Sequence, residues 1–295
     1  MFVALLACTP DPEPLEGDDS ASIETPARAL WVWDTSIPGD DTPTTELLDF
    51  AAEHHVTTLI VPCDPVGNSK PGSVEAYSSF VGSAHAAGLE VLAMSSHGWF
   101  TVACGADLLG QQACWEDGWS VYEACTSSGI GFDGVMDASQ PYSIAPNHWE
   151  NFFPQRGRWT VRYLQGIRTR VGDLPVYHSM PAWYDDLEPF SLNDGTEELT
   201  LNAWIAFNVT ATGVMSYRDD HEEVLDIASA ELQNGSAWLG LEICDSGEGD
   251  SVDFHKEGAA AMIQEAEAIE AALAEEPHFL GVMLHSYACW KESGQ

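Results

Sequence analysis

Three acidic side chains occupy positions from which a protein can do acid–base chemistry. Asp137, Asp219 and Glu242 each lie at or just after the end of a short apolar run of the sequence. Two carboxylates that face one substrate can divide the work, one donating a proton and the other acting as base or nucleophile. These three residues are therefore the candidate catalytic groups.

Aromatic and hydrogen-bonding side chains gather at the same kind of position. Aromatic rings offer large flat faces that pack on the C–H surface of sugar rings, while carboxylate, amide and imidazole groups bind sugar hydroxyls. A site furnished in this way suits a carbohydrate and calls for no cofactor. The candidate substrate-binding residues are Trp33, Asp34, His97, Gln140, Tyr142, His178, Tyr217, His285 and Trp290.

The elements that must position these residues follow a regular alternation. Eight runs rich in Val, Ile, Leu and aromatic residues, with few charges, are typical of strands buried on both faces, and segments with helical spacing separate them. The alternation predicts an α/β protein, a single (β/α)8 barrel over residues 28–295. Because the chain stops soon after the eighth run, the last helix is expected to be missing or atypical. The runs are 29–34, 57–63, 90–96, 132–138, 174–180, 211–217, 237–243 and 279–287.

The fourth run carries a resemblance to a known family. Residues 131–140 read Gly-Phe-Asp-Gly-Val-Met-Asp-Ala-Ser-Gln. They resemble the strand-four signature of family 18 glycoside hydrolases, the chitinases, which is Asp-Gly-x-Asp-x-Asp-x-Glu. Residues 215–219 and 281–285, the latter with Trp290, are similar to the family's sixth and eighth strands. The resemblance implies a TIM barrel that acts on a polysaccharide, with Trp290 as the floor of the sugar site.

The last three acidic residues of this signature are not present in the chain. The three acidic positions of the signature fall on Met136, Ala138 and Gln140. An amide has no acidic proton with which to protonate a glycosidic oxygen, so little chitinase-type activity is expected. The period of two along a strand places Asp137 on the opposite face. Glu242 resembles the nucleophile that ends strand seven in another large group of retaining glycosidases.

Two functions remain open at this level, and a third is disfavoured. The chain is either a barrel that cuts an oligo- or polysaccharide, or a degenerate barrel that holds a glycan without cleaving it. A metal-dependent hydrolase of the amidohydrolase type requires a His-x-His pair on the first strand, where this chain has Trp31-Val32-Trp33. No metal site is therefore expected.

The amino end and the cysteines indicate export. Leu5-Leu6-Ala7-Cys8 resembles the lipobox of bacterial lipoproteins, which implies lipidation of Cys8, with residues 1–8 the remnant of a signal and 9–27 a flexible acidic tether. Residues 1–7 are too few and lack Lys or Arg, so the true start lies upstream or the match is accidental. Six further cysteines predict disulfides. Two pairs are expected to come within range, Cys244 with Cys289 and Cys104 with Cys114.

The charge balance limits the partners. The chain has ten Lys and Arg residues and 47 Asp and Glu residues, which gives a formal net charge of −37. Such a surface repels phosphate backbones and anionic lipid, so no nucleic acid is expected and the membrane is reached only through a lipid anchor. No apolar run approaches the roughly 18 residues of a spanning helix. The sequence therefore predicts an exported acidic protein, a monomer, with carbohydrate as its partner.

Overall fold

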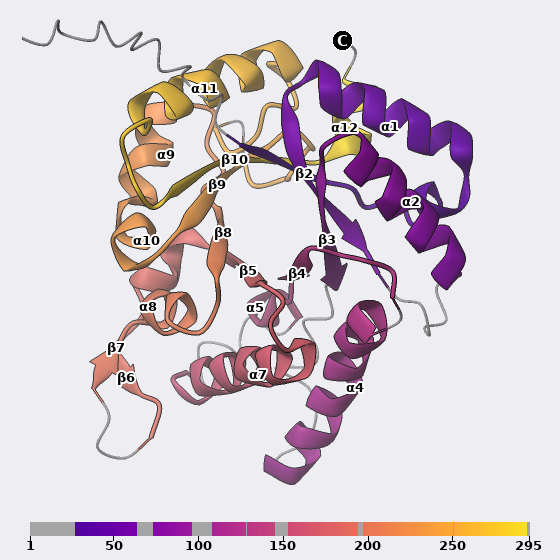
Figure 1. Cartoon of the computed structure of the whole chain (residues 1–295). Coiled ribbons are helices and arrows are strands. Elements are labelled where there is room, and N and C mark those ends of the chain that lie inside the picture. Colours follow the sequence, from indigo (N-terminus) through magenta and orange to yellow (C-terminus); the bar gives the residue numbers. More distant parts are fainter. Residues whose placement is uncertain are drawn as a thin grey trace, which may run out of the picture.

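Eight parallel strands close into a barrel in the computed structural model, which describes residues 27–63, 73–95, 108–127, 129–144, 153–193, 197–249 and 251–293. Each predicted run overlaps one strand, and the order around the barrel is β1-β10-β9-β8-β5-β4-β3-β2 (Figure 1). The predicted fold class is confirmed. The strands are β1 Arg28–Trp31, β2 Val56–Pro62, β3 Glu90–Ser95, β4 Gly134–Asp137, β5 Val176–Pro181, β8 Ala211–Met215, β9 Ala237–Glu242 and β10 Phe279–His285.

Helices surround the strands, as Figure 1 shows. Their starts carry local signals: the Asp40 side chain accepts the backbone N–H of Thr42, and Asp220 accepts those of the first turn of a later helix. The helices are α1 Asp41–Glu53, α2 Val74–Ala86, α4 Leu108–Ser127, α5 Pro141–Ile144, α7 Gln155–Val171, α8 Leu201–Ala206, α9 His221–Ile227, α10 Ser229–Asn234, α11 Ala259–Ala272 and α12 Tyr287–Glu292. Two short 3-10 helices are η1 Ile37–Gly39 and η2 Ala182–Asp185. Outside the barrel, β6 Phe190–Ser191 and β7 Glu198–Leu199 form a small antiparallel pair.

The last helix is atypical, as expected. α12 has six residues, and its Trp290 packs against Phe50 of α1 with ring centroids 4.8 Å apart. Lys291 forms an ion pair with Glu46 of α1 at 2.9 Å. The short helix is thus fastened to α1, while the pairing of β1 with β10 closes the barrel.

Two apolar cores lie on the two sides of the strands. The barrel interior is filled by a small cluster that includes Trp31, Met136, Ala138, Trp238 and Met283. A larger cluster fills the layer between strands and helices. Successive residues of one strand therefore belong to different cores, as the two-residue period of a strand requires.

Strand β10 approaches the start of β1 so closely that one position excludes a side chain. Gly281 has a φ of +123°, and a Cβ there would lie 1.6 Å from the carbonyl oxygen of Ala27. Only glycine combines this backbone conformation with this separation.

Two disulfides tie the elements together. The predicted Cys244–Cys289 bond is confirmed and joins the segment after β9 to α12, with Cα atoms 5.3 Å apart. Cys63–Cys125 joins the end of β2 to α4 and was not predicted, because six cysteines allow 15 pairings. The expected Cys104–Cys114 pair lies outside the described side chains, as do Cys8 and the tether. Across the described residues, the helices are too short or too polar to cross a bilayer.

Candidate functional site

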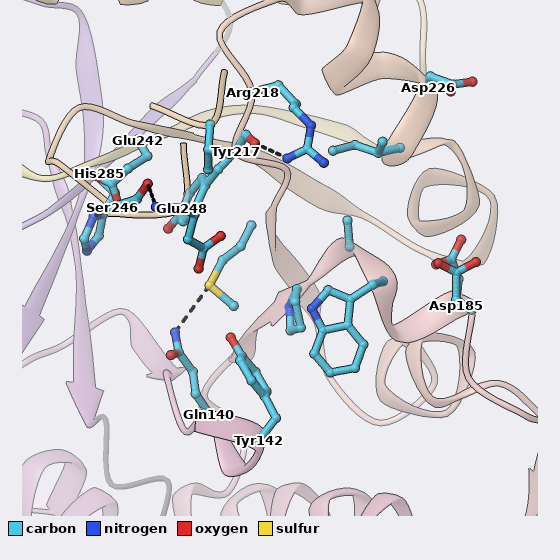
Figure 2. A pocket seen from close by; sticks show the side chains of 17 residues that line it. Gln140, Tyr142, Asp185, Tyr217, Arg218, Asp226, Glu242, Ser246, Glu248 and His285 are labelled. Carbon is cyan, nitrogen blue, oxygen red and sulfur yellow. Dashed lines mark hydrogen bonds and ion pairs between the residues drawn. The ribbon is translucent and has the colours of Figure 1, made fainter. Parts of the chain in front are cut away.

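A cavity of about 670 Å³ opens at the carboxyl ends of the later strands, where the site of a (β/α)8 barrel is expected. Gln140 and Tyr142 follow β4, Trp183 follows β5, and Tyr217 follows β8 (Figure 2). Glu242 and His285 are the last residues of β9 and β10. Four of the expected substrate-binding residues and one expected catalytic residue thus line a single cavity.

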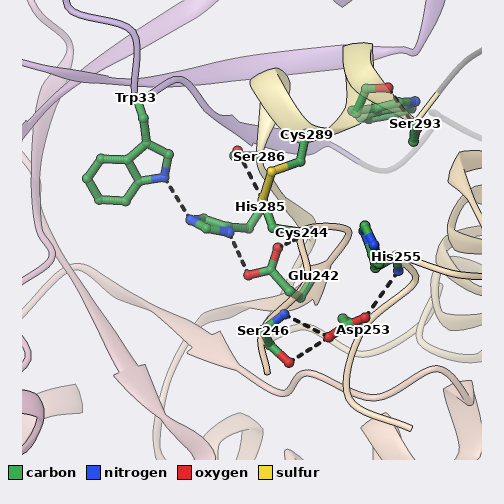
Figure 3. Close-up of a disulfide and its surroundings, with 11 residues drawn as sticks. Trp33, Glu242, Cys244, Ser246, Asp253, His255, His285, Ser286, Cys289 and Ser293 are labelled. Atoms are coloured by element: carbon green, nitrogen blue, oxygen red, sulfur yellow. Dashed lines mark hydrogen bonds and ion pairs between the residues drawn. A yellow bond between two sulfur atoms is a disulfide. The ribbon is translucent and has the colours of Figure 1, made fainter. Parts of the chain in front are cut away.

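Glu242 is held in a fixed orientation at the wall of this cavity. The parallel register of β9 and β10 pairs it with His285, and the residue is only 5% exposed. Oε1 accepts the backbone N–H of Cys244 at 2.7 Å, and Oε2 lies 2.6 Å from Nδ1 of His285. The His285 contact has the distance of an ion pair but not the alignment of a hydrogen bond. The Cys244–Cys289 disulfide lies beside this contact (Figure 3).

His285 connects the carboxylate to an exposed tryptophan. The indole N–H of Trp33 donates to Nε2 of His285 at 2.7 Å, so in a neutral ring the proton sits on Nδ1, the ring nitrogen next to Glu242. Trp33 is 38% exposed and stacks on Trp31, with ring centroids 5.5 Å apart. Indole, imidazole and carboxylate therefore form one chain of contacts at the mouth of the barrel.

Gln140 and two tyrosines also line the cavity. The Gln140 amide donates to the sulfur of Met215 at 3.3 Å. Burial, with the negative charges of Glu242 and Glu248 adding to it, raises the pKa of Tyr217 well above its usual value. Burial raises the pKa of Tyr142 in the same direction. Both phenols keep their protons at any physiological pH and can donate them to a bound hydroxyl or carbonyl oxygen.

A loop after β9 brings a second glutamate to the cavity. Ser246 donates its backbone N–H and its hydroxyl to Asp253, at 2.9 and 2.6 Å, and accepts the backbone N–H of Glu248 at 3.2 Å. The backbone N–H of Phe254 donates to the carbonyl of Glu242 at 2.8 Å. These bonds fold the loop back on the end of β9, so Glu248 lines the same cavity as Glu242.

The outer part of the cavity is aromatic and acidic. Trp183 is 38% exposed and meets Tyr142 edge-on, with centroids 5.2 Å apart. Burial, followed by the neighbouring charge of Asp186, raises the pKa of Asp185. Arg218 donates to the carbonyl of Tyr217 at 2.6 Å. The other acidic lining residue at this end is Asp226.

Asp137 lies on the other side of its strand, as the period of two requires. Its neighbours Met136 and Ala138 fill the barrel interior, whereas Asp137 is 1% exposed and points toward α4. It accepts the hydroxyls of Tyr122 at 2.9 Å and of Ser139 at 2.5 Å, and Nδ1 of His178 lies 2.8 Å from it. His178 is fully buried. Neither Asp137 nor His178 lines the cavity, so the catalytic and substrate-binding roles expected of them do not fit this placement.

Four other expected site residues also lie away from the cavity lining, one of them Trp33, which reaches the site through His285. Trp290 is 1% exposed and packs on Phe50 and His54, so it is a core residue and does not floor the site. Asp219 is half-buried and its backbone N–H donates to Ser251. Asp34 is exposed and accepts the hydroxyl of Ser36 at 2.6 Å. His97 lies outside the described residues.

Four acidic lining residues away from the strand ends were the main omission from the sequence prediction. Glu248 lies in the loop after β9, Asp185 and Asp186 lie at the end of η2, and Asp226 lies on α9, so only the tertiary structure brings them to one cavity. Trp183 follows a strand end and shares the aromatic character of the predicted residues.

One group of potential metal ligands occurs at the site. Glu242, Cys244 and His285 offer ligand atoms within 4.8 Å of one another. The sulfur of Cys244 is bonded to Cys289 and is not a thiolate, so two ligands remain. Catalytic zinc sites use three protein ligands, and this group does not fit one.

The fold is a TIM barrel, and solved structures of glycoside hydrolases share it. A chitinase from Rhizomucor miehei superposes on 89% of this chain and 95% of its own, with a TM-score of 0.56 and 15% identity. The glycoside hydrolase domain of PgaB (BpsB) from Bordetella bronchiseptica matches over 90% and 95%, with a TM-score of 0.53 and 11% identity. One of two fungal β-1,4-galactanases matches over 88% and 87%, with a TM-score of 0.55 and 13% identity.

These likenesses establish the fold. No protein-family model matches the sequence, and curated protein sequences yield no significant match. The strand-four signature accordingly stays a resemblance.

Proposed function

We propose that this protein binds an oligo- or polysaccharide in the cavity at the carboxyl ends of its strands. One observation carries the proposal: a cavity of about 670 Å³ combines exposed aromatic surface at Trp183 with the fixed carboxylate of Glu242 and the protonated phenol of Tyr217. An aromatic face packs on the C–H surface of a sugar ring, and the polar groups form hydrogen bonds with its hydroxyls. The glycoside-hydrolase-like fold adds support.

Binding is tested with soluble oligosaccharides by isothermal titration calorimetry. Trp183→Ala removes the aromatic surface and is expected to weaken affinity by about tenfold. Phe207→Ala is the matched control, because Phe207 is 63% exposed and does not line the cavity. Failure of the wild-type protein to bind fragments of chitin, chitosan, mannan and galactan would contradict the proposal.

Hydrolysis is a second candidate, favoured by the presence of Glu242 and Glu248 in one cavity. Two carboxylates are required, one as acid and one as nucleophile or base, and Gln140 supplies neither. Each of Glu242→Gln and Glu248→Gln is expected to lower the release of reducing ends by at least about 100-fold. Wild-type protein that binds a glycan but releases no reducing ends would leave binding as the function.

Export belongs to the same proposal. Disulfides persist in oxidising compartments, and two are present among the described residues. We propose that Cys8 carries a lipid anchor. Partition with membranes, lost on Cys8→Ala, is the expected result, and an equal partition of both proteins would overturn the anchor.

A further inference from the structure

The lining of the cavity is richer in carboxylates than the chain as a whole. Five of its 17 residues are Asp or Glu, against 47 of 295 in the sequence. Among the described lining residues the single Lys or Arg is Arg218, whose guanidinium donates to the carbonyl of Tyr217 and lies 3.5 Å from Glu223. The cavity therefore presents a strongly negative potential to whatever enters it.

The carboxylates stand at two ends of the cavity. Figure 2 shows Glu242 and Glu248 on the side of His285, and Asp185 and Asp226 on the far side. Trp183 lies in the lining with them. An extended ligand that rests on this tryptophan can meet negative charge on more than one of its units.

The carboxylates at the outer end act on one another. Burial, followed by the charge of Asp186, raises the pKa of Asp185. The same two aspartates contribute, after burial, to raising the pKa of Glu231 behind them to about 7. A cation bound at this end would relieve that repulsion, whereas a neutral sugar would add only desolvation.

A metal ion is a poorer occupant than an organic cation. Within the described part of the chain, the group of three potential ligands that lie within 4.8 Å of one another is Glu242, Cys244 and His285, and its sulfur is in a disulfide. Asp185, Asp186 and Asp226 form no such group. Their charges are spread, as suits ammonium groups carried on separate sugar units.

We infer that the cavity selects a cationic glycan, an oligomer of amino sugars whose amines are free rather than acetylated. The inference rests on the proposed function, since it names the substrate class of the same site. Ammonium groups on successive units would pair with the two sets of carboxylates, while the aromatic surface of Trp183 receives a ring face.

The test compares glucosamine oligomers with N-acetylglucosamine oligomers of the same length by calorimetry, at mildly acidic pH where the amines are protonated. The wild-type protein is expected to bind the free amine form at least about tenfold more tightly at low salt. Raising sodium chloride from about 20 mM to about 0.5 M shortens the screening length and should remove most of that preference.

Variants distinguish the effect of the carboxylates in the cavity from the effect of the protein's net charge. Asp185→Asn with Asp186→Asn is expected to reduce the preference by about fivefold, and Asp226→Asn, a milder change at an exposed position, by about twofold. Asp49→Asn with Glu53→Gln changes the charge equally on α1, outside the cavity, and should leave the preference unchanged. Thermal unfolding verifies that each variant is folded.

Each outcome decides one point. Equal or tighter binding of the acetylated oligomer, insensitive to salt, overturns the inference and leaves glycan binding standing. An equal loss of preference in the α1 control assigns the effect to net charge and also overturns it. If neither oligomer nor any neutral glycan binds, the proposed function itself fails.

Discussion

Replacing Asp137 distinguishes a structural carboxylate from a catalytic one. Asp137 is 1% exposed, and three groups converge on it: the hydroxyls of Tyr122 and Ser139, and Nδ1 of His178. Asp137→Ala leaves all three without this acceptor, inside a layer that water does not reach. The variant is therefore expected to lose stability and to retain the glycan-binding cavity.

The magnitude follows from these contacts. A buried donor left without an acceptor costs about 1–3 kcal/mol, and more where the lost partner is a charged group. Relaxation around the small alanine recovers part of the sum, so the expected loss is about 4 kcal/mol. Asp137→Asn keeps one acceptor oxygen in the same shape and should lose about half as much.

Urea unfolding followed by circular dichroism measures the loss, with Asp49→Ala on the exposed side of α1 as the control. That control should stay within about 0.5 kcal/mol of the wild-type protein. Glycan affinity of the folded Asp137→Ala protein, measured at low temperature, should change by less than about twofold. A variant that keeps its stability but loses binding or cleavage would refute the reasoning, because Asp137 would then act on the substrate.

Two further predictions concern stability. The Cys244–Cys289 bond closes a separation of 45 residues, so Cys244→Ala with Cys289→Ala should lower the free energy of unfolding by about 4 kcal/mol in urea. Cys63→Ala with Cys125→Ala should lose a similar amount. Only the first pair should weaken glycan affinity, since the Cys244–Cys289 bond holds in place the segment whose backbone N–H, at residue 244, donates to Glu242; equal affinities would contradict this. Burial, with the charges of Asp185 and Asp186 adding to it, raises the pKa of Glu231 from 4.5 to about 7. Between these two pH values the folded protein holds a proton that the unfolded chain has lost, so the free energy of unfolding falls as the pH rises from 4.5 to about 7. Glu231→Gln should flatten this decline and be more stable than wild type by up to about 3 kcal/mol above pH 7 or so, with no gain near pH 4; parallel pH profiles would count against it.

Much of the architecture could be predicted from local pattern. The eight apolar runs predicted the strands and their parallel order, because a strand buried on both faces requires an unbroken apolar stretch whatever its neighbours. The period of two placed Asp137 opposite Met136 and Ala138, which the two cores confirm. Glu242 was identified as a strand-end residue for the same reason.

The make-up of the site depended on contacts between distant segments. Trp33 and His285 are 252 positions apart and meet only because β1 and β10 are neighbours in the closed barrel. Trp290 looked like a sugar-binding residue, but α12 turns it onto Phe50 and His54. The local sequence does not show how the short helix after the last strand is oriented, and this orientation decides what Trp290 contacts.

Sequence alone thus determined which residues stand at strand ends, since hydrophobic periodicity is a local property. Tertiary structure alone decided which of them share a cavity, because that depends on how the loops fold over the barrel mouth. The acidic lining is the clearest case: Asp185, Asp226 and Glu248 come from three separate segments. Their charges add into one field only after the chain has closed around them.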